Sequence, residues 1–271
     1  MMQRLFNKAM YRQFGIGIFL AMIGVANAHA EGWLNRDNML PVDDNARLSV
    51  GLNASYNQSG YDKDSTATVL PQAFYDNNRV YLEGSEAGVY AYKDAANEWR
   101  VSVAYDGRSF DPDDANNDAL RKLDQRKWSA LAGTSYMRIT PYGGLKAQVE
   151  TDILGRSKGT RVRLSHLSRF RLLDERLTVY PEIGLLWGSE DYNQYYYGVS
   201  QKESARSGLP AYDADSSVRP FANISASYRL NPRWRVFISE GLERMSDAQK
   251  DSPLVDGSWD SRTRIGFNYQ F

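Results

Sequence analysis

The chain has 271 residues, of which 42% are hydrophobic and 24% are charged, and its formal net charge at pH 7 is zero. It contains no cysteine, which excludes a disulfide framework and a thiolate metal site. Two histidines leave little room for an imidazole metal cluster, so we expect neither a metal nor a cofactor. The mean hydropathy is −0.56, and no run approaches the ~20 apolar residues of a membrane-spanning helix.

The first thirty residues are typical of a cleaved secretory signal. Three basic residues, the last of them Arg12, precede an uncharged and mostly apolar run over residues 14–26. Small residues at alternate positions follow, so we predict cleavage after Ala28 or Ala30. Removing three basic residues and no acidic one leaves the mature chain at −3, which gives no indication of a nucleic-acid partner.

A period of two runs along most of the remaining chain. Between Trp259 and Phe271, apolar or aromatic residues occupy most odd positions and polar residues the even ones. This segment is longer than the ~5–6 residues of a usual globular strand and matches the ~10-residue alternating strands of outer-membrane barrels. Similar alternation occurs over residues 47–56, 98–105, 144–153, 162–170, 177–188, 218–230 and 234–242.

The fold class that we predict is all-β, a transmembrane antiparallel β-barrel of the bacterial outer membrane, over residues 47–271. A soluble β-sandwich would also alternate, but the strand length, the export signal and aromatic residues near strand ends favour the barrel. The 13% aromatic content fits this reading, because Tyr and Trp prefer the membrane interface. Tyr269 and Phe271 resemble the C-terminal assembly signal of such barrels. Residues 31–46 are expected to form an N-terminal periplasmic segment.

The turns predict twelve strands, with ten also possible. Residues 79–93 must form a hairpin bent at Gly84 and Ser85, because a single strand there would give eleven, an odd number. Short turns and both termini of such barrels are periplasmic, and long loops are extracellular. Short connections occur near residues 76–78, 94–97, 141–143, 173–176 and 231–233, and long ones near residues 58–64, 107–126, 188–217 and 246–258.

Three segments carry a resemblance to a known family. The long loop contains Asn193–Ser200 and Glu203–Leu209; Leu123–Lys127 precedes a mid-chain strand, and Asp251–Asp256 precedes the last one. Together they resemble the MltA-interacting protein/OmpV family of outer-membrane proteins. The residues that we expect to form its signature, and a possible interaction patch, are Tyr195, Tyr196, Tyr197, Gly198, Glu203, Arg206, Ser207, Gly208 and Tyr212. A structural alternative is that the tyrosines form an aromatic girdle and that Glu203 pairs with Arg206.

The resemblance implies a non-enzymatic outer-membrane scaffold that contacts outer-membrane lipid. Its implied partners are a lytic transglycosylase and a penicillin-binding protein that synthesises peptidoglycan. Other members are treated as antigens or as routes for solutes, so a narrow channel for small polar solutes is the alternative. The family has no catalytic motif to carry over. Periplasmic partners can reach only the short turns, residues 31–46 and the rim, whereas the predicted topology makes the signature loop extracellular.

The predicted lumen faces are rich in charge. They allow either a charged pore or a plugged lumen in which opposite charges pair, and a twelve-stranded barrel favours a narrow or plugged one. The arginines are Arg100, Arg161, Arg163, Arg169, Arg219, Arg229, Arg262 and Arg264, and the acids are Glu98, Glu150, Asp152, Glu182 and Asp260.

Two weaker patterns suggest other chemistry. His166 and Ser168 share one face of a predicted strand, as an outer-membrane lipase would require, but Glu182 falls on the opposite face. The acidic run Asp111–Asp118 could bind Ca²⁺ through Asp111, Asp113, Asp114, Asn116, Asn117 and Asp118, yet it lacks the spacing of a calcium loop, and a solvated acidic loop is the favoured interpretation.

Overall fold

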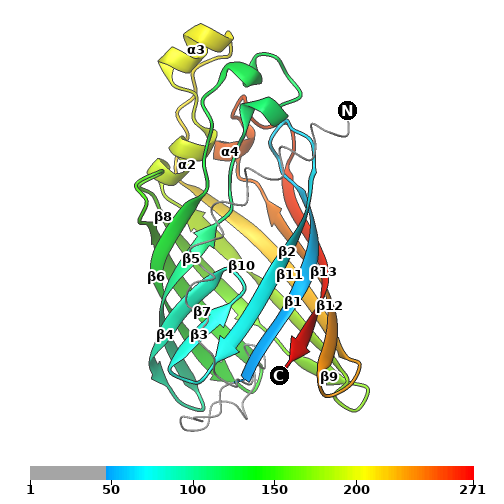
Figure 1. The fold of residues 1–271 in the computed structure, drawn as a ribbon. Coiled ribbons are helices and arrows are strands. Elements are labelled where there is room, and N and C mark those ends of the chain that lie inside the picture. The colour runs from blue at the N-terminus through cyan, green and yellow to red at the C-terminus, as the bar shows by residue number, and fades with distance from the viewer. Residues whose placement is uncertain (1–46) are drawn as a thin grey trace.

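The strands close on themselves into a barrel. The structure is a computed structural model that describes residues 47–271, so the predictions for residues 1–30 and 31–46 lie outside the described residues. The first strand, β1 (Arg47–Gln58), pairs antiparallel with the last, β13 (Trp259–Gln270). Because β10 also pairs with β11, the hydrogen-bonded wall is continuous around the barrel (Figure 1).

The thirteen strands occupy twelve positions in the barrel wall, as predicted, so the alternative of ten strands is wrong. Both β8 and β9 pair with β10, at its two ends, so they are successive parts of one wall strand. The other strands are β2 (Thr66–Asp76), β3 (Val80–Glu83), β4 (Glu86–Lys93), β5 (Asn97–Asp106), β6 (Ser129–Thr140), β7 (Gly143–Asp152), β8 (Thr160–Leu167), β9 (Phe170–Leu172), β10 (Leu177–Gly188), β11 (Ser217–Arg229) and β12 (Trp234–Arg244).

The predicted hairpin within residues 79–93 is present as β3 and β4. Its turn lies at Gly84 and Ser85, and Gly84 adopts φ +60°, a backbone conformation that glycine reaches without a steric penalty. The amide of Gly84 donates to the carbonyl oxygen of Ala73 at 3.2 Å, and that of Tyr105 donates to Ser85 at 2.9 Å. These bonds fix the hairpin tip between β2 and β5.

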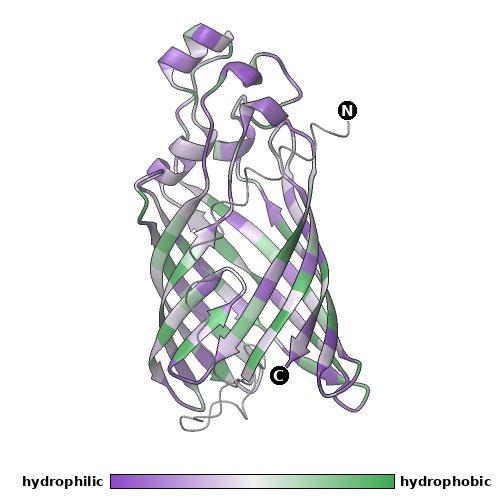
Figure 2. Ribbon diagram, viewed as in Figure 1, coloured by the Kyte–Doolittle hydropathy of each residue, from purple (hydrophilic) through white to green (hydrophobic). Residues whose placement is uncertain are grey.

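Exposure along the strands is inverted relative to a water-soluble protein. In β5, Glu98 and Arg100 are buried at 4% and 2% exposure, whereas Trp99 and Val101 are 49% and 47% exposed. Apolar residues therefore face outward and charged ones inward, which is the arrangement that lipid around the barrel requires. Figure 2 shows hydrophobic and hydrophilic residues mixed along the same strands. Within residues 47–271, no helix has the length and apolarity needed to cross a membrane.

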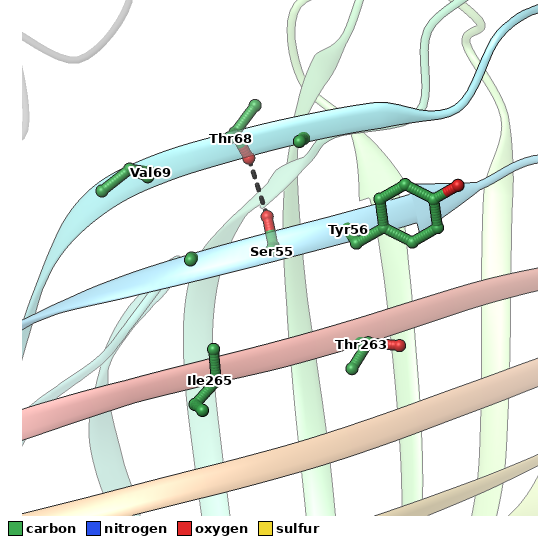
Figure 3. A pocket seen from close by; sticks show the side chains of 8 residues that line it. Ser55, Tyr56, Thr68, Val69, Thr263 and Ile265 are labelled. Carbon is green, nitrogen blue, oxygen red and sulfur yellow. Dashed lines mark hydrogen bonds between the residues drawn. The ribbon is translucent and has the colours of Figure 1, made fainter.

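The outer wall of β13, β1 and β2 is hollowed by small side chains. Ala54 and Ala67 lie among Tyr56, Val69 and Ile265 and leave an open groove of about 290 Å³ without a charged lining residue (Figure 3). Across the same strands, the hydroxyl groups of Ser55 and Thr68 share a hydrogen bond of 2.7 Å. The groove belongs to the apolar outer face rather than to the lumen.

The segments that connect consecutive strands differ in length between the two ends of the barrel. Short turns and the C-terminus lie at one end, and the long connections, with the helices of residues 47–271, lie at the other (Figure 1). By the rule for such barrels, the first end is periplasmic and the second extracellular. The helices are the 3₁₀ turns η4 (Pro112–Asp114) and η5 (Leu120–Lys122) and the α-helices α2 (Glu190–Tyr197), α3 (Gln201–Ser207) and α4 (Asp247–Lys250).

Candidate functional site

Four extracellular loops fold into one body, which we call the dome. It comprises residues 59–65, 107–128, 189–216 and 245–258. The loops share a single hydrophobic core, so none of them is a separate flexible hairpin. The buried residues of this core are Tyr61, Phe110, Ala115, Leu120, Leu123, Tyr192, Tyr196, Tyr197, Val199, Ala214, Met245 and Leu254.

Helix α2 places the dome across the barrel mouth. It begins at the N-cap Ser189, directly after β10, and the Tyr192 hydroxyl donates to Asp106 at the end of β5 at 3.0 Å. The Tyr61 hydroxyl, from the β1–β2 loop, donates to the carbonyl oxygen of Tyr196 at 3.0 Å. Because α2 starts at one point of the rim and reaches strands and loops around it, the dome covers the extracellular mouth.

Helix α3 is held to the β5–β6 loop by a buried carboxylate. Glu203 closes a capping box with Ser200, accepts from the Asp124 amide at 3.0 Å and pairs with Arg126 at 2.8 Å. Burial raises the pKa of Glu203, but the amides of Asp124 and Ser200 and the Arg126 guanidinium more than offset this and hold the pKa at about 2. The helix ends at Gly208, which adopts φ +80°.

The structural alternative for the signature loop is wrong in both parts. Tyr196 and Tyr197 lie in the dome core with no exposed surface, because α2 folds inward over the mouth and does not line the lipid interface. Glu203 pairs with Arg126, and Arg206 pairs with Asp124 at 2.8 Å, since α3 packs against the β5–β6 loop and turns the two side chains toward it rather than toward each other.

The remaining signature residues also serve the dome itself. The Tyr195 hydroxyl accepts from the Lys127 amide at 2.9 Å, and the Tyr212 hydroxyl donates to Ala248 at 3.0 Å. Ser207 is buried, and its hydroxyl accepts from the Leu209 amide at 3.1 Å. The interaction patch stays a prediction, and Arg206, with 48% of its side chain exposed, is its most accessible charged member.

An ion-pair network connects the dome to the lumen wall beneath it. Arg219 of β11 pairs with Glu243 of β12 at 3.0 Å and with Asp260 of β13 at 3.4 Å. Arg108, from the dome, pairs with Asp260 at 2.9 Å and bonds to the Tyr197 hydroxyl. Sequence reasoning did not select Arg108 or Glu243, because their partners are distant in the chain and no local pattern marks them.

Charges of the two signs are unevenly distributed around the rest of the lumen, although buried cations such as Lys146 also lie on the more acidic wall. Several acidic side chains line the wall from β2 to β7, among them Glu83 and Glu98, which hold the buried Arg100. Arginines predominate from β8 to β13, and some of them pair with carboxylates, such as Arg163 with Glu182 at 3.8 Å. The lumen-facing arginines of that wall include Arg161, Arg163, Arg219, Arg229, Arg235, Arg262 and Arg264.

The periplasmic end is built from short turns. Between the β9–β10 turn and the β11–β12 turn lies a cavity of about 350 Å³, lined by Arg176, Arg229, Arg235 and Gln270 together with the β11–β12 turn itself. The C-terminus lies at this end, where the ring of Tyr269 packs edge-on against Phe271 at 5.0 Å. The assembly role of these two aromatic residues stays a prediction.

The two weaker patterns gain no support from the geometry. The His166 ring nitrogen Nε2 lies 3.1 Å from the carbonyl oxygen of Tyr142, and Glu182 pairs with Arg163 inside the lumen, on the other face from His166. In the acidic loop, Asp111 caps η4 by accepting from the Asp113 amide. Among the residues that the structure describes, no three His, Asp or Glu side chains are grouped as a metal site would need.

Comparison with known proteins decides the family. The model of the MltA-interacting protein MipA family matches residues 50–271. The chain belongs to this family. The MltA-interacting protein of Escherichia coli is 34% identical over 94% of this chain and 97% of its own length. The putative outer membrane protein YiaT of the same organism is 29% identical over 83% and 92%, and OmpV of Vibrio cholerae is 28% identical over 56% and 57%.

Membership of the MipA family and the names of these relatives place this barrel in the outer membrane. Among solved structures, the NanC porin gives a TM-score of 0.44 at 10% identity, over 81% of this chain and 98% of its own. An outer membrane channel from Pseudomonas putida F1 gives 0.44 at 9% identity, over 86% and 97%. The names of the relatives describe outer-membrane proteins and, for one of them, an interaction with MltA.

Proposed function

We propose that this protein is a non-enzymatic scaffold that holds a lytic transglycosylase and a peptidoglycan-synthesising penicillin-binding protein at the periplasmic rim of the barrel. The observation that carries the proposal is the dome. Four loops pack into one hydrophobic core over the extracellular mouth. The charged groups of the lumen that a partner protein can reach therefore lie at the periplasmic mouth. That is the face that murein enzymes can reach.

The relatives support the same reading. The Escherichia coli relative is named for an interaction with MltA, and the shared identity extends over nearly the whole of both chains. Lipid contact through the apolar outer wall, including the groove on β13, β1 and β2, belongs to the same proposal. The dome provides an internal control for partner binding at the rim, because it belongs to the same chain but lies at the opposite end of the barrel.

The experiment is a retention assay with the purified full chain, immobilised in detergent micelles. A soluble MltA-type transglycosylase and a penicillin-binding protein are passed over it separately and together. We expect retention above that of an unrelated outer-membrane barrel, and unchanged retention by Arg206→Ala, which alters only the dome. Retention no greater than the control barrel would contradict the scaffold, and retention lost with Arg206→Ala would place the contact on the wrong face.

A narrow channel for small polar solutes is the second candidate. The uneven distribution of charge favours it, with acidic side chains more numerous from β2 to β7 and arginines more numerous from β8 to β13, because a transverse field orients dipolar solutes. Passage would require the dome to move from the mouth. We expect planar bilayers to show rare openings for the native chain and frequent ones for Phe110→Ala, which weakens the dome core. If both folded proteins are silent, the channel is excluded.

A further inference from the structure

The hydrogen-bonded wall between β2 and β5 is incomplete on its extracellular side. The β3–β4 hairpin occupies this position from the periplasmic end, but it pairs only with residues 74–76 of β2 (Figure 1). At the hairpin tip, the Gly84 amide donates to the carbonyl oxygen of Ala73. Beyond that bond, β2 pairs with β1 alone among the residues that the structure describes. Residues 66–72 therefore form a free strand edge, about 20 Å long at ~3.3 Å per residue.

This free edge carries backbone groups without partners. Alternate residues of a strand direct their amide and carbonyl groups toward opposite neighbours. Because the Ala73 carbonyl oxygen faces the hairpin, the backbone groups of Ala67, Val69 and Pro71 face the free edge. Within residues 47–271, none of these groups forms a hydrogen bond. Proline lacks an amide hydrogen, so Pro71 leaves one donor fewer unpaired and protects the edge against pairing with a further strand.

Other segments of the chain bound the unpaired region. Opposite the free edge, β5 ends at Asp106 and the chain continues into the dome. On the extracellular side, Lys63 Nζ donates to the Ser109 carbonyl oxygen at 3.3 Å, and Lys63 forms a bridge with Ala115. On the periplasmic side lies the hairpin tip. We call this bounded region between β2 and residues 106–110 the side opening.

The apolar groove of the outer wall lies beside the side opening. Ala67 and Val69 belong both to the groove lining and to the free edge (Figure 3). Val69 is 69% exposed on the outer face, and Leu70, on the lumen face, is 38% exposed. The groove volume of about 290 Å³ is at the small end of ligand pockets, which span ~300–1,000 Å³, and this size suits one acyl chain.

A polar row on the lumen face connects the free edge to a guanidinium group. Thr66 pairs with Asn57 of β1, and Asn57 pairs with Arg262 of β13. Asn57 Nδ2 donates to the Thr66 carbonyl oxygen at 3.4 Å, and Asn57 Oδ1 accepts from Arg262 Nε at 2.6 Å. The Arg262 side chain is exposed and forms no ion pair within residues 47–271, while the neighbouring Asp260 is paired with other arginines. A guanidinium group without a carboxylate favours an anionic ligand.

We propose that the side opening is a lateral portal that binds a single-chain amphiphile with an anionic headgroup. The acyl chain lies in the groove against Ala67 and Val69, and the headgroup reaches Arg262 through the opening. Unpaired backbone groups are tolerated at membrane depth only where protein or water covers them. The free edge therefore lines a water-filled opening, which a charged headgroup can enter. This site is separate from the proposed scaffold contact at the periplasmic rim.

The first test is hydrogen exchange of the full chain in vesicles of phosphatidylethanolamine. The amides of Ala67 and Val69 should exchange on the order of a hundredfold faster than those of Thr68 and Leu70, which face β1. Equal protection of all four amides would show that a second copy or another segment pairs with the edge, which would overturn the portal.

The second test uses a fatty acid with a photoreactive diazirine beside its carboxylate, in the same vesicles. We expect saturable labelling of lumen-facing residues next to the free edge. Ala67→Trp fills the groove and should weaken this labelling about tenfold. The matched control is Ala147→Trp, at an exposed alanine on the outer face of β7, which should change it less than about twofold. Labelling confined to outer-face residues, or an equal loss in both variants, would indicate an ordinary lipid contact and overturn the portal.

The role of the headgroup is tested with Arg262→Gln, which should also weaken labelling about tenfold. The control is Arg229→Gln, at the periplasmic end of β11, which should change labelling less than about twofold. Heat-modifiable migration on a gel shows that each variant is folded. Equal loss in the two arginine variants would overturn the assignment of the headgroup to Arg262.

Competitors define the ligand class. The unlabelled fatty acid should displace the probe, and the corresponding fatty alcohol should not; equal displacement by the alcohol would overturn the anionic headgroup. Displacement by phosphatidylglycerol would show that a two-chain bilayer lipid occupies the groove, which also overturns the proposal. Lysophosphatidylglycerol distinguishes two sources of a single-chain anionic ligand: stronger displacement than by the fatty acid assigns the site to a lysophospholipid, and weaker displacement assigns it to a fatty acid.

Discussion

The dome and the periplasmic rim use arginine in opposite ways. In the dome, Arg126 is buried against Glu203, and at the dome's base Arg108 and Arg219 share the carboxylate of Asp260. At the rim, Arg176 lines an open cavity with no acidic side chain in its wall. Long loops supply enough chain to build a core around their charged pairs, whereas a short turn pairs charges only at the surface, as Arg171 does with Glu175 at 3.1 Å. The dome is therefore built for closure, and the rim leaves its charge available to a ligand.

The largest expected effect comes from emptying the dome core. Phe110 has no exposed surface, so Phe110→Ala should destabilise the closed dome by about 3–5 kcal/mol through lost contacts and a cavity. Trypsin cleavage within residues 107–128 should become much faster. Migration of the unheated protein should stay that of a folded barrel, because the strand ladder does not involve Phe110.

The matched control is Phe170→Ala, the same change at a residue of β9 that is 54% exposed on the outer wall. It should leave dome cleavage unchanged. If Phe110→Ala unfolds the whole barrel instead, dome and barrel form one cooperative unit, and the comparison between the two regions fails.

A smaller effect is expected where the dome meets the wall. Asp260 accepts from the Gly60 amide at 2.8 Å and pairs with Arg108 and Arg219, so Asp260→Asn leaves two buried guanidinium groups with one carboxylate fewer. We expect the free energy of dome opening to fall by about 2–3 kcal/mol. Hydrogen exchange of dome peptides measures this.

Asp118→Asn is the control for this change. Asp118 is 91% exposed and pairs only with Arg121 on the dome surface, so its loss should be nearly neutral. Equal exchange in the two variants would show that the network under the dome does not hold it closed.

The barrel was predictable from the sequence because lipid-facing and lumen-facing residues alternate along each strand. Alternation of apolar and polar residues identifies strands whatever lies at their ends, and the odd strand count exposed the hairpin at Gly84 and Ser85. The inward direction of Arg100 and the outward direction of Trp99 follow from the same period. A strand interrupted after Leu167 still counted as one, since both parts pair with β10.

The dome was not predictable in the same way. Its helices lack a repeating pattern, and its contacts join distant segments, as when the Tyr61 hydroxyl reaches Tyr196. The sequence identified the signature residues but suggested a girdle for the tyrosines and a local pair between Glu203 and Arg206. Neither holds, because loop conformation depends on which neighbouring loops offer a core and charged partners.

Acid should loosen the dome before it affects the rim. The pKa of Glu203 is about 2 in the folded dome against an ordinary 4.5, so the unfolded dome binds the proton more tightly. The stabilisation is complete above pH 4.5 and is lost as pH falls from 4.5 to 2. Glu203→Gln keeps the capping geometry but not the charge. Dome exchange in the native chain and in this variant should therefore differ at pH 6 and converge near pH 2; a constant difference would contradict the assignment.

The smallest structural effect is expected at the rim, where β11 provides an internal comparison. Arg219 and Arg229 both face the lumen from this strand, but only Arg219 has carboxylate partners. Arg229→Gln should change the free energy of unfolding in urea by less than about 0.5 kcal/mol, because it breaks no ion pair and relieves repulsion among the rim arginines. Arg219→Gln, which removes a buried guanidinium group from its pairs with Glu243 and Asp260, should cost several-fold more. Equal destabilisation of the two variants would show that Arg229 stabilises the barrel as Arg219 does. The idea that the rim keeps its positive charge available for a ligand would then be wrong.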